Sequence, residues 1–309
     1  MWCWHMSEMR ITFLGTGGGM PSKKRNLPAI ALRTSNALTI LDCGEGTQRQ
    51  MIYAGLGMKE EIHVFVTHLH GDHVLGIPGL LFTLTMNMRK DDVFVHGPEG
   101  ISDFLKAVLR PQLGVLGFQV VVDEIEPGDS VRVGNLTVEA FKTDHTHNSQ
   151  GYVIKEDPRP GRMREDFLEK LGVPRGPLWG MLQRGKTIEF AGRKITPEEA
   201  LGPPRPGRKV VYTGDTRPSE TILEAAEEAD VLIHDATFDS RLADKALEEK
   251  HSTALEAAKT AAAAQVRRLY LFHISPRYDD TSILLNEARE VFPESYVAED
   301  LESYAVPFR

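Results

Sequence analysis

Short apolar runs alternate with amphipathic segments along most of the chain. Short runs rich in Val, Ile, Leu and Phe predict strands, and longer segments with apolar residues at helical spacing predict helices. The expected strands are 10–14, 29–33, 37–42, 62–67, 93–96, 120–125, 131–143, 151–154, 210–213, 231–234 and 269–272. The expected helices are 45–54, 74–88, 101–109, 220–229 and 254–264. Two series of strands with flanking helices favour an α/β (αββα) sandwich, in which two sheets pack face to face with helices outside.

One segment, 156–209, breaks this pattern because it is rich in Gly, Pro and Arg. Its twelve basic and eight acidic residues give it a charge of +4. Because the whole chain has a net charge of −8, the remaining residues carry −12. A loop longer than about 15 residues is usually functional or disordered, which argues against a plain solvated loop. We therefore expect an N-terminal extension at 1–9, a main domain at 10–309, and an arm inserted into that domain at about 156–209.

Length and composition narrow the class of protein. The 309 residues suffice for one large α/β domain. The net charge of −8 argues against a non-specific nucleic-acid binder, although it does not exclude local basic patches. The two cysteines, Cys3 and Cys43, provide neither a disulfide framework nor a cysteine-rich zinc site, as is typical of a reducing cytosol. The chain has no apolar stretch of about 18 residues and no signal-peptide pattern at 1–9, so we expect a cytoplasmic protein without a membrane span, starting at Met1, Met6 or Met9.

Four potential metal ligands directly follow the expected strand 62–67: His68, His70, Asp72 and His73. Residues two apart in an extended segment point to the same side, so His68 and His70 face one position. A glycine then lets the chain turn, so that Asp72 and His73 face a second position nearby. Imidazole and carboxylate groups suit zinc or a similar divalent ion. This spacing seldom arises by chance and therefore favours a pair of metal sites over a polar loop of surface histidines.

Three later candidates also lie where an expected strand ends: His145, Asp215 and His273. Strand ends along one edge of a sheet are where sites assemble, so these side chains are expected to meet the first four. Asp215 is the natural bridging ligand because both of its carboxylate oxygens can bind a metal. Each residue has an alternative: Asp215 as a helix cap, His273 as a core histidine, and His147 in place of His145.

With these motifs the chain resembles the metallo-β-lactamase superfamily and, within it, the tRNase Z family of endonucleases that mature tRNA 3′ ends. The matching segments are 13–17, 21–26, 42–47, 67–73, 144–145, 151–152, 172–177, 212–216, 234–238, 251–253 and 273–278. The His-x-His-x-Asp-His motif is specific to the superfamily. The Gly/Pro-rich block at 172–177, the His-Ser-Thr at 251–253 and the Arg-Tyr after His273 are specific to the tRNase Z branch.

The resemblance implies two Zn²⁺ ions per subunit, with Mn²⁺ or Fe²⁺ as alternatives. The ligands it implies are His68, His70 and His145 for one ion, Asp72, His73 and His273 for the other, and Asp215 as the bridge between them. Two such ions share a hydroxide that attacks phosphorus in line, and they steady the charge on the phosphoryl oxygens. Asp72 has a further expected role in orienting that hydroxide.

The leaving ribose 3′ oxygen needs a proton, for which His251 is the candidate acid and Asp235 its orienting carboxylate. A carboxylate beside an imidazole raises the imidazole pKa and keeps the ring cationic at working pH. The family commonly has Glu at the position of Asp235, so this chain has a shorter side chain there. The alternative is a helix N-terminus capped by Ser252 or Thr253, with His251 merely exposed.

Several cations and aromatic residues are candidates for RNA binding. They are Arg175, Arg184 and Lys186 in the arm, Lys23, Lys24 and Arg25 near the first strand end, and Arg277 with Tyr278 after His273. Arg and Lys side chains would neutralise phosphates, although each could instead be an ordinary surface charge. Trp179 either stacks on a base or packs the arm. The resemblance also implies a homodimer, in which the arm of one subunit docks the tRNA that the other cleaves.

The expected function is removal of the 3′ trailer from tRNA precursors, leaving a 3′-hydroxyl on the tRNA. The alternative is a superfamily hydrolase of small esters: an arylsulfatase, a cyclic-nucleotide phosphodiesterase or a lactonase. An RNA-binding scaffold with an inactive site is disfavoured because the ligand set is complete.

Overall fold

The computed structural model describes residues 8–35, 37–57, 59–110 and 114–309. They form two compact units, one made of the chain up to Lys155 with Lys209–Pro307, the other of Glu156–Arg208 with Phe308–Arg309. Most of the expected N-terminal extension, with Cys3 and Met6, lies outside the described residues. Met9 belongs to the core of the first unit, since it is fully buried and its carbonyl accepts a hydrogen bond from the Val306 amide at 2.9 Å.

The first sheet has the spatial order β16-β1-β2-β3-β4-β5-β6. Its strands are β1 (Arg10–Gly15), β2 (Ala29–Arg33), β3 (Ala37–Leu41), β4 (Glu61–Phe65), β5 (Val93–Gly97), β6 (Val120–Glu124) and β16 (Ser303–Ala305). The pairs from β3 to β6 are parallel, and the pairs among β16, β1, β2 and β3 are antiparallel. The parallel part directs the carboxyl ends of its strands to one edge, where the segment that follows β4 begins.

The second sheet has the order β15-β14-β13-β12-β9-β8-β7. Its strands are β7 (Ser130–Val133), β8 (Leu136–Lys142), β9 (Gln150–Glu156), β12 (Lys209–Tyr212), β13 (Val231–Asp235), β14 (Leu269–Phe272) and β15 (Ser295–Val297). The pairs from β12 to β15 are parallel, so this sheet also collects strand ends at one edge.

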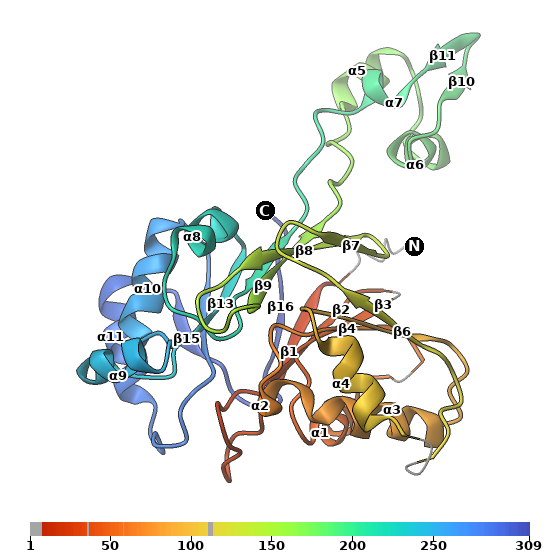
Figure 1. Ribbon diagram of the computed structural model, residues 1–309. Coiled ribbons are helices and arrows are strands. Elements are labelled where there is room, and N and C mark those ends of the chain that lie inside the picture. The colour runs from red at the N-terminus through yellow and green to blue at the C-terminus, as the bar shows by residue number, and fades with distance from the viewer. Residues whose placement is uncertain (1–7, 36, 58, 111–113) are drawn as a thin grey trace. The chain divides into compact units, whose positions relative to one another are not determined.

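The two sheets pack through an aromatic and aliphatic core and carry helices on their outer faces (Figure 1). The core between the sheets includes Phe13, Phe65, Tyr152, Tyr212, Tyr270 and Phe272. The first sheet is covered by α1 (Thr47–Tyr53), α2 (Gly71–Val74), α3 (Gly76–Met86) and α4 (Ile101–Val108). The outer face of the second sheet is covered by α8 (Glu220–Ala226), α10 (Ala254–Ala263) and α11 (Ser282–Val291). Between β13 and α10, the chain forms η2 (Ser240–Leu242) and α9 (Ala243–Glu248). The αββα arrangement expected from the sequence is therefore confirmed.

Two expected elements were wrong in detail. The single strand expected at 131–143 is a hairpin, because the chain turns at Gly134, whose φ of 56° is in the left-handed region that glycine favours. The helix expected at 74–88 is two helices, α2 and α3, and α2 starts earlier, within the metal-ligand motif. No helix in the described part of the chain has the length and apolar character that crossing a bilayer requires.

The second unit, which we call the arm, is a folded element with its own small core. It contains α5 (Glu165–Lys170), α6 (Pro177–Gln183), β10 (Ile188–Phe190), β11 (Arg193–Ile195) and α7 (Pro197–Ala200). Leu168, Val173, Leu182, Ile188, Ile195 and Ala200 form the core, and Trp179 packs against it. At its base, Arg208 and Glu156 form a buried ion pair at 2.6 Å.

Candidate metal centre

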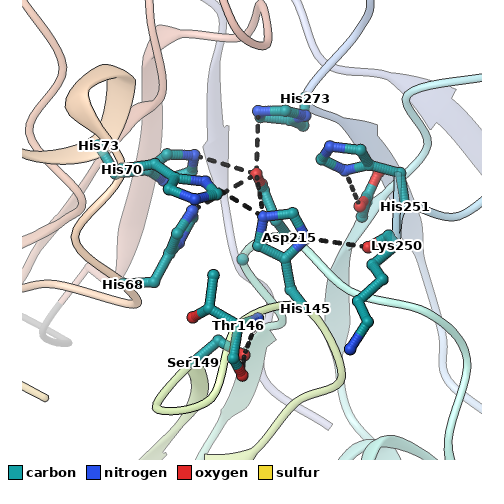
Figure 2. A network of polar contacts seen from close by, with 12 residues as sticks. His68, His70, His73, His145, Thr146, Ser149, Asp215, Lys250, His251 and His273 are labelled. Carbon is teal, nitrogen blue, oxygen red and sulfur yellow. Dashed lines mark hydrogen bonds and ion pairs between the residues drawn. The ribbon is translucent and has the colours of Figure 1, made fainter. Parts of the chain in front are cut away.

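Seven of the side chains named from the sequence meet at the ends of strands from both sheets. Figure 2 labels all of them except Asp72. His68 and His70 follow β4, and Asp72 and His73 lie on α2. His145 follows β8, Asp215 follows β12 and His273 follows β14. Donor atoms of His68, His70, His145 and Asp215 lie within 4.8 Å of one another, and so do those of Asp72, His73 and His273.

Asp215 lies between the two groups. Its Oδ2 is 3.3 Å from the Nε2 atoms of His73 and His273. The same oxygen is 3.7 Å from His68 Nε2 and 3.9 Å from His145 Nε2. One carboxylate thus faces both groups, which is the arrangement that a bridging ligand requires.

The donor atoms of this cluster fit a metal centre. His68 Nε2, His73 Nε2 and Asp215 Oδ1 are buried and have no hydrogen-bond partner among the described residues. Buried polar atoms are normally paired, so these orphaned atoms on ligand side chains of both groups call for bound cations. Nitrogen and carboxylate donors suit Zn²⁺, and also Mn²⁺ or Fe²⁺.

Four of the histidines hold Nδ1 against a neighbouring oxygen and turn Nε2 inward. Nδ1 of His73 lies 2.8 Å from Asp42 Oδ2, and Nδ1 of His145 lies 3.0 Å from the Lys250 carbonyl. Nδ1 of His68 and of His273 lie 3.0 and 2.9 Å from the hydroxyls of threonines 67 and 237. Each hydroxyl donates its own proton to a carboxylate and therefore accepts one from the imidazole. The Nε2 lone pairs are left for a metal.

Asp42 is a supporting residue for which the sequence reasoning assigned no role. Besides His73, its carboxylate accepts hydrogen bonds from Tyr212 Oη at 2.7 Å and from Thr67 Oγ1 at 2.9 Å. Its φ is 56°, and His273 has a φ of 59°, both unusual for residues other than glycine. Such strained positions cluster at functional sites, where the surrounding contacts hold them.

The two carboxylates in the cluster are held in their ionised form. Burial acts to raise the pKa of Asp215, but His273 and His73 outweigh it and bring the pKa well below its ordinary value. Burial likewise acts to raise the pKa of Asp72, and the hydrogen bond and charge of His273 lower it instead. Burial lowers the pKa values of His68 and His145, which leaves these rings neutral. Burial acts to lower the pKa of His73 too, but Asp215 and Asp42 outweigh it and raise the pKa well above its ordinary value, so a metal ion at this ring would displace its proton. Anionic carboxylates and neutral imidazoles are the forms that bind a cation.

His251 and Asp235 form a pair at the rim of the cluster. Nδ1 of His251 lies 2.8 Å from Asp235 Oδ2, and Asp235 is almost fully buried. Burial acts to lower the pKa of His251, but the Asp235 carboxylate outweighs it and raises the pKa to about 9. The aspartate side chain is therefore long enough to reach the His251 ring. Since His251, Asp215 and His273 also have donor atoms within 4.8 Å, its ring faces the cluster.

The alternatives weighed for single residues have structural answers. Helix α8 is capped by Ser219, so Asp215 has no capping role. Helix α10 is capped by Thr253 in a capping box with Glu256, while His251 lies largely buried two residues earlier. His147 is exposed, and the cluster contains His145 instead.

The glycine-rich turn after β1 closes the cluster from one side. A Cβ atom on Gly18 would lie 2.3 Å from the His273 ring, so only glycine fits there. The Gly19 amide donates a hydrogen bond to Asp72 Oδ2 at 2.8 Å. The turn therefore positions one ligand by shape and another by a backbone hydrogen bond.

The expected RNA contacts fall into different environments. Arg25 was expected to contact phosphate or to be an ordinary surface charge, but it is only 7% exposed. It donates hydrogen bonds to Thr16 Oγ1 at 2.6 Å and to Glu299 Oε1 at 2.6 Å, so its guanidinium is already engaged within the protein. Its guanidinium ties the loop after β1 to the C-terminal segment. Lys23 and Lys24 are exposed, and Lys24 Nζ donates to the Asp279 carbonyl at 2.8 Å.

Arg277 and Tyr278 support the loop after β13. The Arg277 guanidinium lies 4.8 Å from the centre of the Phe238 ring, and Tyr278 Oη donates to Asp239 Oδ2 at 3.0 Å. Partial burial and Asp239 raise the pKa of Tyr278 to about 12. The phenol therefore stays protonated and keeps this bond.

In the arm, the three expected cations are all exposed, but they differ in their surroundings. Arg184 and Lys186 lie in and just after the turn that ends α6. Arg175 contacts Glu165 Oε2 at 2.6 Å and Glu169 Oε1 at 2.8 Å. Trp179 donates Nε1–H to the Val173 carbonyl at 3.2 Å and packs on the arm core.

Comparisons with known proteins find relatives along nearly the whole chain. A family model described as "Anti-Pycsar protein Apyc1" matches residues 9–158, and one described as "Beta-lactamase superfamily domain" matches residues 189–274. A ribonuclease Z from Methanosarcina mazei is 47% identical over 302 residues, covering 97% of this chain and 99% of the relative. A ribonuclease Z from Haloferax volcanii is 48% identical over 305 residues, covering 97% and 96%. The crystal structure of human tRNase Z, short form, is similar with a TM-score of 0.71 at 29% identity, covering 97% of this chain and 100% of that one.

Proposed function

The chain belongs to the ribonuclease Z family and has the metallo-β-lactamase fold, and from this premise we propose that it is an endoribonuclease that removes the 3′ trailer from tRNA precursors, leaving a 3′-hydroxyl on the tRNA. The observation that carries the proposal is the match to ribonuclease Z relatives over nearly the whole length of both chains. The convergent His/Asp cluster supports it, because it offers the chemistry that phosphodiester hydrolysis needs.

Two divalent metal ions, which we take to be Zn²⁺, would be held by the seven clustered side chains. His68, His70 and His145 would hold one ion, Asp72, His73 and His273 the other, with Asp215 shared. When bound, such a pair of ions supplies Lewis acidity, which acidifies water and stabilises charge on the phosphoryl oxygens.

Two side chains of the protein would orient the attacking water and donate a proton to the leaving group. Asp72 is ionised, so its carboxylate can accept a hydrogen bond from the attacking water and orient it. His251 is the proton donor to the leaving ribose 3′ oxygen. Its Nδ1 is occupied by Asp235, which leaves Nε2 as the nitrogen that transfers the proton.

The arm is the proposed docking surface for the body of the tRNA. A groove on it is lined by four cations, two acidic residues and two aromatic rings: Arg162, Arg164, Lys170 and Arg205, Glu165 and Asp166, and Phe167 and Trp179. Cations suit phosphates and aromatic rings suit unstacked bases, so this surface has the composition of an RNA-binding face. Arg184 and Lys186 extend the positive charge. We further propose that the protein acts as a homodimer in the cytoplasm.

The test is to incubate the protein with a tRNA precursor that carries a 3′ trailer and to map both ends of the cut. The expected products are a tRNA with a 3′-hydroxyl and a trailer with a 5′-phosphate. Removing the metal with a chelator should abolish cleavage, and adding Zn²⁺ or Mn²⁺ should restore it. Cleavage of small phosphodiesters or sulfate esters without any cleavage of the precursor would instead identify a small-ester hydrolase.

A further inference from the structure

We infer that Arg217 is a positioning residue for His251, because it fixes the backbone from which the His251 imidazole reaches the metal cluster. The inference rests on the proposed function, in which His251 donates the proton to the leaving oxygen. Arg217 lies two residues after Asp215, and none of the roles derived above involves it.

The Arg217 guanidinium contacts both the backbone of His251 and the first turn of helix α10. Its Nη1 donates a hydrogen bond to the His251 carbonyl at 2.6 Å and another to Glu256 Oε2 at 2.9 Å. Its Nη2 is also bonded to Glu256 Oε1, which completes a two-pronged ion pair. The Arg217 side chain is 16% exposed, so solvent screens this pair less than it would screen one at the surface.

Glu256, the ion-pair partner of Arg217, also contacts Thr253, two residues after His251. Its Oε2 accepts a hydrogen bond from the Thr253 amide at 2.8 Å, and the Thr253 hydroxyl in turn accepts one from the Glu256 amide at 3.2 Å. Between these contacts, Ser252 Oγ donates to the Thr216 carbonyl at 2.6 Å. The peptide on either side of Ser252 is therefore held from the 215–217 segment.

The 215–217 segment is itself fixed against two parts of the site. The Arg217 amide donates to the Asp144 carbonyl at 3.0 Å, beside the ligand His145. The Thr216 amide donates to Asp235 Oδ2 at 3.0 Å, the oxygen that also contacts His251. Arg217 thus holds the backbone end of His251, while Asp235 holds its ring.

Both restraints are needed for proton transfer. Asp235 sets the rotation of the imidazole, but it cannot prevent a shift of the backbone that carries it. Without Arg217, the His251 carbonyl would lose the guanidinium that donates a hydrogen bond to it, and the backbone could shift. A misplacement of about 1 Å can lower a reaction rate by about 10²-fold. Lysine can offer one donor to the carbonyl but lacks the planar fork that also engages both oxygens of Glu256.

The first measurement is single-turnover cleavage of the 3′-extended tRNA precursor by Arg217→Ala and Arg217→Lys. We expect Arg217→Ala to lower the rate about 10-fold or more with unchanged tRNA affinity and metal content, and Arg217→Lys to recover part of the loss. The matched control is Arg33→Ala, which removes another arginine–glutamate ion pair, Arg33–Glu60 at 2.8 Å, outside the site. The control should keep the wild-type rate.

A double-mutant cycle with His251→Ala separates positioning from general stability. If Arg217 acts through His251, its substitution should change the rate less than about 3-fold once His251 is gone. Multiplicative losses would overturn the inference, and so would a wild-type rate in Arg217→Ala or a loss of bound metal in Arg217→Lys. Where Arg217→Ala does not fold, Arg217→Lys carries the cycle.

A spectroscopic readout makes the inference testable independently of turnover. In protein labelled with ¹⁵N-histidine, the His251 ring signals can be assigned by their loss in His251→Ala. Arg217→Lys should shift those signals and leave the signals of His63 and His96 in place, because that pair lies on the strands β4 and β5. Unshifted His251 signals would refute the role of Arg217, whereas a wild-type protein that leaves the precursor uncut would refute only the proposed function.

Discussion

In the metal centre the charged groups are buried and held by several fixed partners, whereas in the arm most cations face the solvent. For example, the single carboxylate of Asp42 is fully buried and accepts hydrogen bonds from His73, Tyr212 and Thr67. In the arm, Arg184 and Lys186 are exposed, and the core that supports them is small. The centre depends on the placement of individual atoms, while the arm depends on the sum of its charges.

This contrast predicts how each region responds to substitution. One changed side chain in the centre removes a contact that nothing else replaces, so the effect should be large and specific to catalysis or metal binding. One changed cation in the arm should have a small effect on affinity that depends on salt. The following experiments test both halves of the contrast, starting with the largest expected effect.

Asp72→Ala should lower the cleavage rate by at least about 10³-fold, as is usual for groups on which the chemistry itself depends. It removes a carboxylate that lies 3.4 Å from His273 Nε2 and 3.6 Å from His73 Nε2. Binding of precursor tRNA, measured by gel shift, should persist. Asp103→Ala, an exposed aspartate on α4, is the control and should cleave normally. Loss of tRNA binding in Asp72→Ala would show that Asp72 is structural.

Asp235→Asn should move the alkaline limit of activity to lower pH. Asp235 is the group that raises the pKa of His251 to about 9 against the effect of burial. Without its charge, the largest influence that opposes burial is gone, and the pKa falls toward its ordinary value of 6.5. The acid form of His251 then persists to about pH 9 in the wild type but is lost near neutrality in the variant, which at pH 8 costs roughly 10-fold or more. Rates measured from pH 5.5 to 9.5 check this, and coinciding profiles would exclude His251 as the acid.

Asp42→Asn should weaken metal binding by about 10- to 100-fold, the usual effect of losing a partner of a metal-bound histidine. Asparagine keeps the size of the side chain and tolerates the φ of 56°, so the fold should survive. The measurement is bound metal per chain after dialysis against graded chelator concentrations. Asp129→Asn, at an exposed turn, should retain the wild-type metal content.

Candidate metal ligands could be predicted from the sequence where residue type and local spacing were sufficient evidence. His68, His70 and His73 stand out because few other roles need three imidazoles directly after a buried strand. Runs of apolar residues likewise predicted both sheets, because burial between two layers demands such runs. Asp215 and His273 could be named because each directly follows an apolar strand.

What could not be predicted depends on contacts between segments far apart in the chain. Asp42 and Thr237 become supporting residues only because the fold places them behind His73 and His273. Arg25 is of the type that binds phosphate, but the C-terminal segment buries it. The hairpin at Gly134 was missed because the apolar run continues on both sides of the turn.

In the arm, the double substitution Arg184→Ala with Lys186→Ala should weaken tRNA binding several-fold without changing the single-turnover rate at saturating enzyme. Each lost phosphate contact should reduce the slope of log affinity against log salt by about 1. Binding is measured in the Asp72→Ala background between 50 and 300 mM salt, so that no substrate is consumed. An unchanged slope would mean that neither cation contacts phosphate.

Arg175 should have the smallest effect of the arm cations, because its guanidinium is already engaged by Glu165 and Glu169 at 2.6 and 2.8 Å. To contact a phosphate it would have to leave both carboxylates, so Arg175→Ala alone should change the salt slope by less than the loss of Arg184. Replacing both glutamates by glutamine frees the guanidinium, and tRNA affinity at low salt should then rise. If the gain comes from Arg175 rather than from reduced repulsion, it should disappear when Arg175→Ala is added. A gain that persists in the triple variant would show that the arm responds only to its net charge.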